Sequence, residues 1–238
     1  MSSMSPTGSV LNRTVVVVTG LSSFIGYHLA CYFARKNMHV IGTLTQPPQS
    51  AAYDILRRQR IEQARLLGVT YQVLDITDRE TVDTFIDDVQ PDYWIHHAGW
   101  ATDYGSPEYD LEKGKAINID PLDGLYAKLA AVNCKGVVVT GSSAEYSNQD
   151  LACLESAVCE PVTPYGQSKL AETQEAERCA EKYKVPTRVA RVFIPYGQMD
   201  ADQKLIPSTI WAWVSQQAIE LTDCSQLRDF IYVDDLCK

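Results

Sequence analysis

The sequence predicts an α/β protein built on a doubly wound parallel sheet, and three observations support this. Short apolar runs alternate with longer helix-like segments along most of the chain, which is typical of strands that are each followed by a crossover helix. The runs are apolar on both faces, so helices should cover both sides of the sheet. Right-handed crossovers then place ligands at the carboxyl ends of the strands.

The predicted elements follow one another in that order. The first three strand and helix pairs are Thr14 to Thr19 with Phe24 to Lys36, His39 to Leu44 with Tyr53 to Leu67, and Thr70 to Leu74 with Arg79 to Val89. They are followed by a strand at Asp92 to His97, a helix around Ala116 to Val132, a strand at Gly136 to Thr140, a long helix at Tyr165 to Tyr183 and a strand at Thr187 to Phe193.

After Pro195 the alternation changes. We predict a helix at Leu205 to Gln217 and short strands near Ile219 to Leu221 and Phe230 to Val233. The chain has 238 residues, of which 45% are hydrophobic, so it is long enough for one core with a smaller lobe attached.

Composition excludes several classes of protein. A formal net charge of −9 argues against a nucleic-acid partner or an anionic membrane surface, because either would need a concentrated basic face. The apolar run Val15 to Val18 is too short to span a bilayer, and Met1 to Arg13 has no apolar stretch like that of a signal peptide. We therefore predict a cytoplasmic protein.

No metal site is expected. The seven cysteines are scattered and include no C-x-x-C pair, so we predict free thiols. His96 and His97 are adjacent and would point to opposite faces of a strand, where they cannot easily share an ion.

The turn after the first predicted strand has the form of a dinucleotide-binding loop. Gly20 permits a tight turn, Gly26 permits close packing of helix on strand, and the N-terminus of the helix offers free N–H groups to a pyrophosphate. Ser23 replaces the middle glycine, so the phosphate sits farther out or the hydroxyl donates to it. Similar turns also join strands to helices without any ligand.

Tyr165 and Lys169 form a candidate catalytic pair. They are four residues apart on a predicted helix, so they share one face, and an ammonium beside a phenol lowers the pKa of the phenol toward neutrality. Such a phenol exchanges a proton with an alcohol or ketone, and Ser142 or Ser143 could hydrogen-bond the same substrate oxygen. The alternative is a packing tyrosine beside a solvated lysine.

Taken together, these motifs resemble the extended short-chain dehydrogenase/reductase family, the NAD(P)-dependent epimerase/dehydratase group, whose members act largely on nucleotide sugars. The resemblance covers almost the whole chain. Its motifs are Thr19-Gly20 through Gly26, Leu74-Asp75-Ile76, His96 to Gly99, Asn118, Ser142-Ser143, Pro164 to Lys169, Arg191 through Gly197, and Arg228 to Asp235. It implies a Rossmann-like domain (13–194) after a flexible N-terminus (1–12), and a partial substrate-binding lobe (195–238).

The resemblance also implies residue roles. Tyr165 would be the acid/base, Lys169 would lower its pKa and hold the nicotinamide ribose, and Ser142, or Ser143 if the loop is shorter here, would orient the substrate oxygen. Substrate-binding candidates are Ser142, Arg228 and Lys204, of which Arg228 would meet the diphosphate. Cofactor-binding candidates are Gly20, Ser22, Ser23, Phe24, Ile25, Gly26, Thr45, Asp75, Ile76, Ala98, Gly99, Asn118, Tyr165 and Lys169.

The chain departs from the family pattern at the end of the second strand. A carboxylate there usually binds the 2′-hydroxyl of NAD, but Leu44, Thr45 and Gln46 occupy the stretch. Thr45 is compatible with a 2′-phosphate that Arg57 or Arg58 would reach, so NADP is favoured over NAD.

Three further departures bear on the reaction. Ser143 and Ala144 follow Ser142 where dehydratases carry an Asp-Glu pair, which disfavours dehydration, and Glu145 would substitute only in a realigned loop. Ile194 replaces a substrate-side asparagine. The chain stops soon after Asp235, where relatives continue with much of the substrate lobe.

Three hypotheses follow. The first is an NADPH-dependent reductase of a 4-keto nucleotide sugar, and the second is a nucleotide-sugar 4-epimerase with tightly bound NAD. The third is a non-catalytic nucleotide-binding module, motivated by Ser23, Ile194 and the short C-terminus. The family resemblance also makes a homodimer possible, through the helices predicted at Ala116 to Val132 and Tyr165 to Tyr183.

Overall fold

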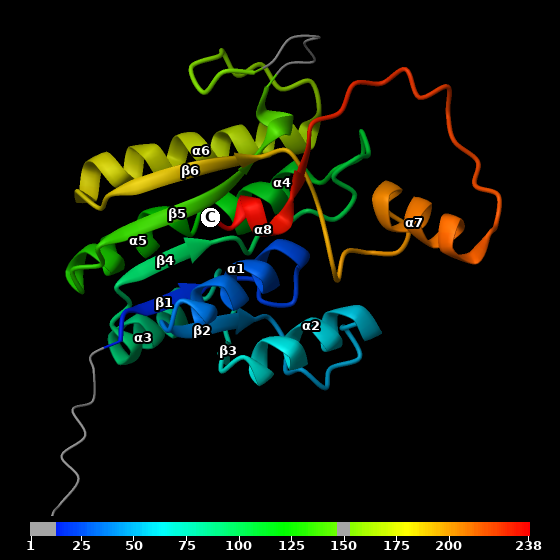
Figure 1. Cartoon of the computed structure of the whole chain (residues 1–238). Coiled ribbons are helices and arrows are strands. Elements are labelled where there is room, and N and C mark those ends of the chain that lie inside the picture. Colours follow the sequence, from blue (N-terminus) through cyan, green and yellow to red (C-terminus); the bar gives the residue numbers. More distant parts are fainter. Residues whose placement is uncertain (1–12, 147–152) are drawn as a thin grey trace, which may run out of the picture.

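A computed structural model describes residues 13–146 and 153–238. The N-terminus expected to be flexible, residues 1–12, lies outside the described residues. Figure 1 shows a parallel sheet of six strands in the order β3-β2-β1-β4-β5-β6, which confirms the prediction of a doubly wound fold. The strands are β1 (Val15–Val18), β2 (His39–Leu44), β3 (Thr70–Val73), β4 (Tyr93–His96), β5 (Gly136–Ser142) and β6 (Thr187–Val192).

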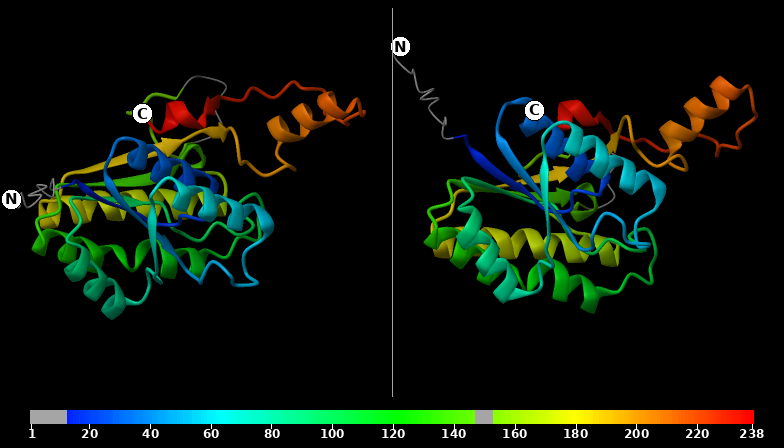
Figure 2. Two further views of the ribbon diagram at one scale, coloured as in Figure 1. Left: turned by 60° about the horizontal axis from the view of Figure 1, so that its bottom comes forward. Right: turned by 90° about the horizontal axis from the view of Figure 1, so that it is seen from below.

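Helices cover both faces of this sheet (Figure 2). One face carries α1 (Phe24–Arg35) and α2 (Ile55–Leu66), and the other carries α3 (Arg79–Val89), α5 (Leu122–Ala131) and α6 (Pro164–Tyr183). The central strand β1 supplies both cores, because successive side chains of a strand point to opposite faces. Val16 and Val18 pack into the core under α1 and α2, while Val17 packs into the core under α3, α5 and α6.

Side-chain caps fix the start of each crossover helix near the carboxyl edge of the sheet. Ser23 accepts the backbone N–H of Gly26 at the start of α1, and Thr163 accepts that of Gly166 at the start of α6. Caps of this kind satisfy one of the N–H groups that a helix leaves unpaired and leave the others free. The edge of the sheet where a ligand is expected is therefore rich in helix N-termini.

The helix predicted at Ala116 to Val132 is interrupted in the structure. It consists of α4 (Leu111–Gly114), a π-helical turn η1 (Lys115–Ile119) and α5. The helical path starts earlier than predicted because Asp110 caps α4 by accepting the N–H of Lys113, and it breaks before α5 because Pro121 has no N–H to continue it. Single π turns are often found at functional sites, and η1 contains Asn118.

The C-terminal segment forms a separate small sheet. Strand β7 (Ile194–Tyr196) pairs in parallel with β8 (Phe230–Tyr232), as predicted for Phe230 to Val233, and the helix predicted at Leu205 to Gln217 is present as α7 (Leu205–Ser215). The strand predicted near Ile219 to Leu221 is wrong: this segment is exposed and has no strand partner among the described residues, so nothing fixes it as a strand.

The two ends of this segment lie in different surroundings. Helix α7 stands away from the sheet, whereas the short helix α8 (Val233–Leu236) lies against α1 (Figures 1 and 2). His28 of α1 approaches Asp234 of α8 at 3.9 Å. Within the described residues, no helix is both long and apolar enough to cross a membrane.

Candidate active site

The loop between β1 and α1 has the backbone geometry of a dinucleotide site. Gly20 has a φ of 77°, in the left-handed region that favours glycine. A Cβ on Gly26 would lie 2.3 Å from the Gly20 carbonyl oxygen. The Ser23 hydroxyl donates to the Gly20 carbonyl at 2.8 Å and accepts the Gly26 N–H at 3.0 Å. The Ser23 hydroxyl proton is therefore used within the loop, so it is not free to donate to a phosphate of the dinucleotide.

A buried threonine joins this loop to the end of β4. The Thr19 hydroxyl accepts the backbone N–H groups of His97 and Ala98, both at 2.8 Å, and donates to the Ile95 carbonyl at 3.3 Å. The Ala98 backbone consequently lies close to Gly20. A Cβ on Gly20 would be 3.3 Å from the Ala98 backbone. The expected cofactor-lining stretch Ala98-Gly99 and the glycine loop thus lie side by side.

Asn118 anchors the chain that leaves β4. Its side-chain oxygen accepts the Trp100 N–H at 2.6 Å, and its side-chain nitrogen donates to the Trp100 carbonyl at 3.3 Å. A Cβ on Gly99 would lie 2.9 Å from that oxygen. Asn118 was predicted to bind the cofactor. In the structure its side chain binds the backbone of the loop after β4, which contains the expected cofactor-lining residues Ala98 and Gly99.

Tyr165, Lys169 and Ser142 meet at the carboxyl edge of the sheet. Ser142 is the last residue of β5 and lies close enough to Tyr165 to lower the pKa of its phenol, while Tyr165 and Lys169 lie on the first turns of α6. Of the two serines left open by the sequence, Ser142 makes this contact, and Ser143 begins the 3₁₀ turn η2 (Ser143–Glu145). The three residues thus form one hydroxyl-phenol-ammonium cluster.

The electrostatics of this cluster differ from the expectation. Burial raises the pKa of the Tyr165 phenol above its ordinary value, and Lys169 together with Ser142 lowers it only in part. Burial is the largest cause, and Glu172, whose carboxylate binds the Lys169 ammonium at 2.6 Å, also raises the pKa of Tyr165. The expectation that Lys169 lowers the pKa of Tyr165 toward neutrality therefore does not hold in this structure.

Glu145 is fully buried and has a structural role. Its carboxylate accepts the Ser142 N–H at 2.7 Å, the Thr173 hydroxyl at 3.0 Å and the Arg191 side chain at 2.8 Å. These bonds fix the turn that positions Ser142. They also leave Glu145 unsuited to moving substrate protons, in agreement with the sequence argument against dehydration.

Aromatic side chains pack around Tyr165. The rings of Tyr104 and Tyr109 lie 5.7 and 5.6 Å from its ring. Lys204, a predicted substrate ligand, hydrogen-bonds the Tyr104 hydroxyl at 2.6 Å and so reaches the cluster through Tyr104. Arg228, the other predicted ligand from the C-terminal segment, is exposed and donates to the Leu227 carbonyl, so the structure does not bring it to the cluster.

The end of β2 does not gather cations. Thr45 lies 3.5 Å from the Tyr53 hydroxyl, which also accepts the Gln46 N–H at 3.1 Å. The arginines expected to reach a 2′-phosphate are exposed and engaged locally, Arg57 with Asp54 at 3.8 Å and Arg58 with the Ser50 carbonyl at 3.2 Å.

The two residues expected to lie at the adenine, Asp75 and Ile76, form the turn after β3. Asp75 is exposed and accepts the N–H and hydroxyl of Thr77, whereas Ile76 is half-buried. Ile76 lines a cavity of about 200 Å³ together with His96 and Ala116.

Comparison with known proteins identifies the family. The model of the NAD dependent epimerase/dehydratase family matches residues 16–238. The chain belongs to this family. It is of the extended short-chain dehydrogenase/reductase type, as the resemblance implied.

Relatives of this epimerase/dehydratase chain are longer than it is. It is similar to a UDP-glucose 4-epimerase of Cyamopsis tetragonoloba, with 25% identity over 244 residues that cover 93% of this chain and 68% of the relative. A probable UDP-glucuronate 4-epimerase of Rhizobium meliloti (strain 1021) is 28% identical over 231 residues, which cover 93% of this chain and 65% of that protein. The chain thus spans about two thirds of the length of these relatives.

A solved structure of the same family shares the fold. The UDP-glucuronic acid 4-epimerase of Bacillus cereus, in complex with UDP-glucuronic acid and NAD, superposes with a TM-score of 0.75 at 22% identity, over 94% of this chain and 71% of its own.

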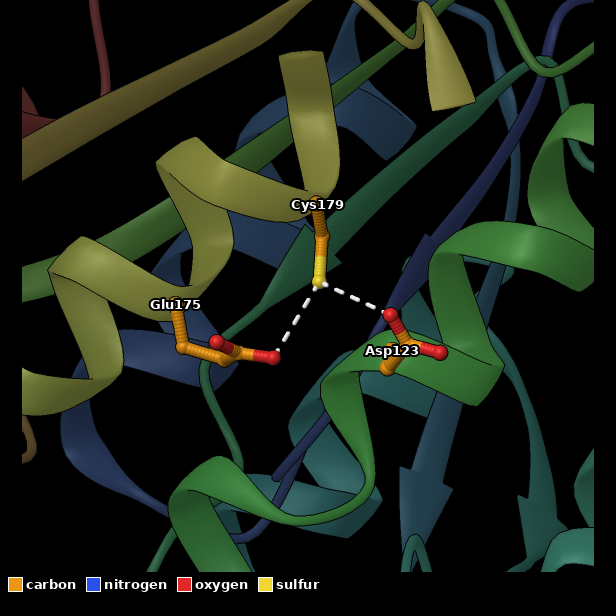
Figure 3. Close-up of side chains that lie close together, drawn as sticks. All are labelled: Asp123, Glu175 and Cys179. Atoms are coloured by element: carbon orange, nitrogen blue, oxygen red, sulfur yellow. Dashed lines mark hydrogen bonds between the residues drawn. The ribbon is translucent and has the colours of Figure 1, made fainter. Parts of the chain in front are cut away.

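A cluster on the outer face of this epimerase/dehydratase chain has the side chains of a metal site but not its electrostatics. Asp123 of α5 and Glu175 and Cys179 of α6 point toward one another (Figure 3), with ligand atoms within 4.8 Å. Lys182 and Arg178 already bind Asp123 at 2.8 and 2.9 Å, and burial raises the pKa of Cys179 to about 12. We assign no metal to it. All seven cysteines are free thiols, as predicted.

Sequence reasoning missed two buried charged residues near the site. Arg60 of α2 donates to the Ser22 carbonyl at 3.1 Å and to the Met199 carbonyl at 2.7 and 2.9 Å, which ties the glycine loop of the family to the turn after β7. Glu172 binds Lys169. The sequence did hold a signal for Glu172, because it follows Lys169 by one helical turn on the same face. It held none for Arg60, which has the pattern of any polar residue on an exposed helix.

Proposed function

We propose that the chain is a nucleotide-sugar 4-epimerase that uses NAD. The observation that carries this proposal is the Ser142, Tyr165 and Lys169 cluster, which lies at the same sheet edge as the glycine loop. The relatives named above are 4-epimerases by name, and they favour this hypothesis over the 4-keto reductase that the sequence placed first.

The residues present fit a dinucleotide. At Gly20, Gly26 and Gly99 the backbone packs so closely against its neighbours that a Cβ would crowd them, as in a tight dinucleotide loop. The first N–H groups of α1, at Phe24 and Ile25, have no intrahelical acceptor. In the proposed arrangement these groups, with Ser22 and Ala98, bind the dinucleotide, and Lys169 binds its ribose.

Each member of the cluster has a separate task in the reaction. Bound NAD supplies a hydride acceptor and donor. Tyr165 would take the proton from the 4-hydroxyl of the sugar and return it to the same oxygen after the 4-keto sugar has turned the opposite face of C4 toward the dinucleotide, and Ser142 would orient that oxygen. Glu145 holds Ser142 in place through its backbone N–H.

NAD is proposed in preference to NADP. The structure of the Bacillus cereus relative contains NAD, and in this chain Arg57 and Arg58 are occupied by neighbours of their own loop. Because Thr45 stands where a carboxylate would repel a 2′-phosphate, we expect discrimination between the two dinucleotides to be small, about tenfold or less.

The segment 195–238 is proposed as part of a substrate lobe. Lys204 is linked to the cluster through Tyr104, which supports its place beside the substrate. A role for Arg228 at the diphosphate would require the exposed stretch before β8 to fold toward α6. The homodimer formed by α5 and α6, and the cytoplasmic location, remain predictions.

The test is direct observation of epimerisation. The purified chain is incubated with NAD and either UDP-glucose or UDP-glucuronate, and formation of the C4 epimer is followed by proton NMR. Replacement of Tyr165 with Phe removes the acid but little volume, so we expect turnover to fall by at least about 100-fold, while binding of NADH, measured by fluorescence, stays unchanged.

Three outcomes would contradict the proposal. Unchanged turnover in Y165F would remove Tyr165 from the mechanism. NADH binding without epimerisation of either sugar, together with reduction of a 4-keto sugar, would favour the reductase; binding with no turnover at all would favour the non-catalytic module.

A further inference from the structure

Arg60 is a buried arginine of α2 that bridges two distant parts of the chain. It is 6% exposed. Its Nη1 donates to the Ser22 carbonyl at 3.1 Å, and its Nε and Nη2 donate to the Met199 carbonyl at 2.9 and 2.7 Å. Within the described residues, carbonyl oxygens rather than a carboxylate thus accept its hydrogen bonds. Because a buried charge without a paired counter-charge is costly, packing alone does not account for an arginine at this position.

Both carbonyls belong to tight turns. Ser22 lies in the glycine loop, and Met199 lies in the turn after β7 with a φ of 65°, in the left-handed region that is strained for a residue other than glycine. The ring of His28 on α1 lies beside the same turn. A carbonyl can only accept, so His28 Nε2 donates to the Gln198 carbonyl at 2.8 Å. Side chains of α1 and α2 therefore hold the turn 197–200 against the body of the protein.

This turn leads directly to the proposed catalytic cluster. Lys204 follows shortly after Met199 and donates to the Tyr104 hydroxyl at 2.6 Å. The Tyr104 ring in turn lies 5.7 Å from the Tyr165 ring. The position of Lys204 beside the cluster thus depends on the turn, and the turn is bonded to Arg60.

We propose that Arg60 is a positioning residue that couples the glycine loop to residues 197–204, so that a dinucleotide bound at the loop also fixes the segment that carries Lys204. This rests on the proposed function only in placing the dinucleotide at the loop. A dinucleotide phosphate at the N-terminus of α1 restrains the loop, and Arg60 passes this restraint from the Ser22 carbonyl to the Met199 carbonyl. Because such coupling is reciprocal, release of the turn also weakens binding of the dinucleotide.

Hydrogen exchange of the chain without any ligand tests the bridge itself. Amide exchange is followed by mass spectrometry in the unaltered chain and in Arg60→Leu, which removes all three bonds. We expect exchange in R60L to be at least about tenfold faster both in the glycine loop and in residues 197–204. The control is Arg65→Leu on the same helix, because Arg65 pairs with Glu62 at an exposed position, and R65L should exchange like the unaltered chain.

Addition of saturating NADH separates coupling from a merely structural role. In the unaltered chain and in R65L, NADH should slow exchange in residues 197–204 by at least about fivefold. In R60L, NADH should protect the glycine loop alone, because the restraint no longer reaches Met199.

Three results would overturn the proposal. The first is faster exchange in only one of the two segments, or in neither, in ligand-free R60L. The second is protection of residues 197–204 by NADH in R60L as in the unaltered chain, and the third is its absence in an unaltered chain that binds NADH by fluorescence. If NADH did not bind at all, the proposed cofactor would be wrong, and the ligand-free comparison would decide the role of Arg60 by itself.

A second variant covers the case in which R60L does not fold, as judged by near-ultraviolet circular dichroism. Arg60→Lys keeps the charge, but its single ammonium lacks the planar fork that reaches both carbonyls at once. We expect a smaller increase of exchange in both segments, and exchange equal to that of the unaltered chain would again overturn the proposal.

Discussion

Single buried carboxylates bind the serine and the lysine of the proposed catalytic cluster. Ser142 is the last residue of its strand. Its backbone N–H donates to the Glu145 carboxylate, which also accepts a hydrogen bond from the Arg191 side chain. The Arg191 side chain lies in turn over the Tyr146 ring at 5.2 Å. The precision of the serine therefore depends on a carboxylate that has no chemical part in the reaction.

Replacement of Glu145 with Ala should destabilise the fold strongly. The change leaves Arg191 without its carboxylate and the Ser142 N–H without an acceptor in a buried site, and breaking such a pair costs about 3–5 kcal/mol. The free energy of unfolding, measured by urea titration, should fall by this amount. Glu62→Ala is the control, because Glu62 pairs with Arg65 at an exposed position where the loss should stay below about 1 kcal/mol. Equal losses in the two variants would contradict this account of Glu145.

At the scale of elements, the turn from β1 into α1 joins fold and function. Within this turn Ser23 caps α1 by accepting the Gly26 N–H. Gly26 has a Cα so close to the Gly20 carbonyl that the helix can begin only because glycine lacks a Cβ. The dinucleotide site is thus a consequence of how tightly α1 packs on β1.

Gly26→Ala should therefore weaken dinucleotide binding. A Cβ placed 2.3 Å from the Gly20 carbonyl oxygen would push the start of α1 away from the strand, and we expect the Kd for NADH to rise by at least about tenfold. Fluorescence titration measures this. Gly105→Ala is the control, since a Cβ there meets no atom within 4 Å, and its Kd should not change. A normal Kd in folded G26A would rule out close packing as the reason for this glycine.

The sequence predicts elements with strong periodicity well and long-range pairs poorly. The six strands and α6 follow from apolar runs, and Gly20 and Tyr165 from local spacing. The π turn at Asn118 was not predicted, because it depends on a bond to Trp100 across the site. The high pKa of Tyr165 was not predicted either, because burial and the contact of Glu172 with Lys169 appear only once α6 is packed.

At the scale of the whole molecule, two strongly exposed tryptophans lie on α7. Trp211 is 68% and Trp213 is 81% exposed, on a helix that stands away from the sheet (Figure 2). Trp94, by contrast, is fully buried in the core under α3 and α5. The tryptophans of this chain therefore report on two different parts of it.

Iodide quenching should separate these tryptophans. An ionic quencher reaches exposed indoles only, so replacing both Trp211 and Trp213 with Phe should remove most of the quenchable emission and shift the remaining spectrum to shorter wavelength. Trp94→Phe should leave the quenchable fraction unchanged, although it removes core volume. Half-buried Trp100 leaves a small quenchable remainder in W211F/W213F; if the quenchable fraction did not fall at all, α7 would not stand exposed in solution.

The pairing of β7 with β8 closes the chain between them into a loop. Ile194 pairs with Phe230 and Tyr196 with Tyr232. The residues from 197 to 229 therefore form a loop whose two ends are held together by the paired strands. The entropy of closing such a loop grows slowly with length, by about 0.6 kcal/mol for each doubling. Insertions in this stretch would therefore destabilise the six-stranded domain little, so its length can vary without loss of the fold.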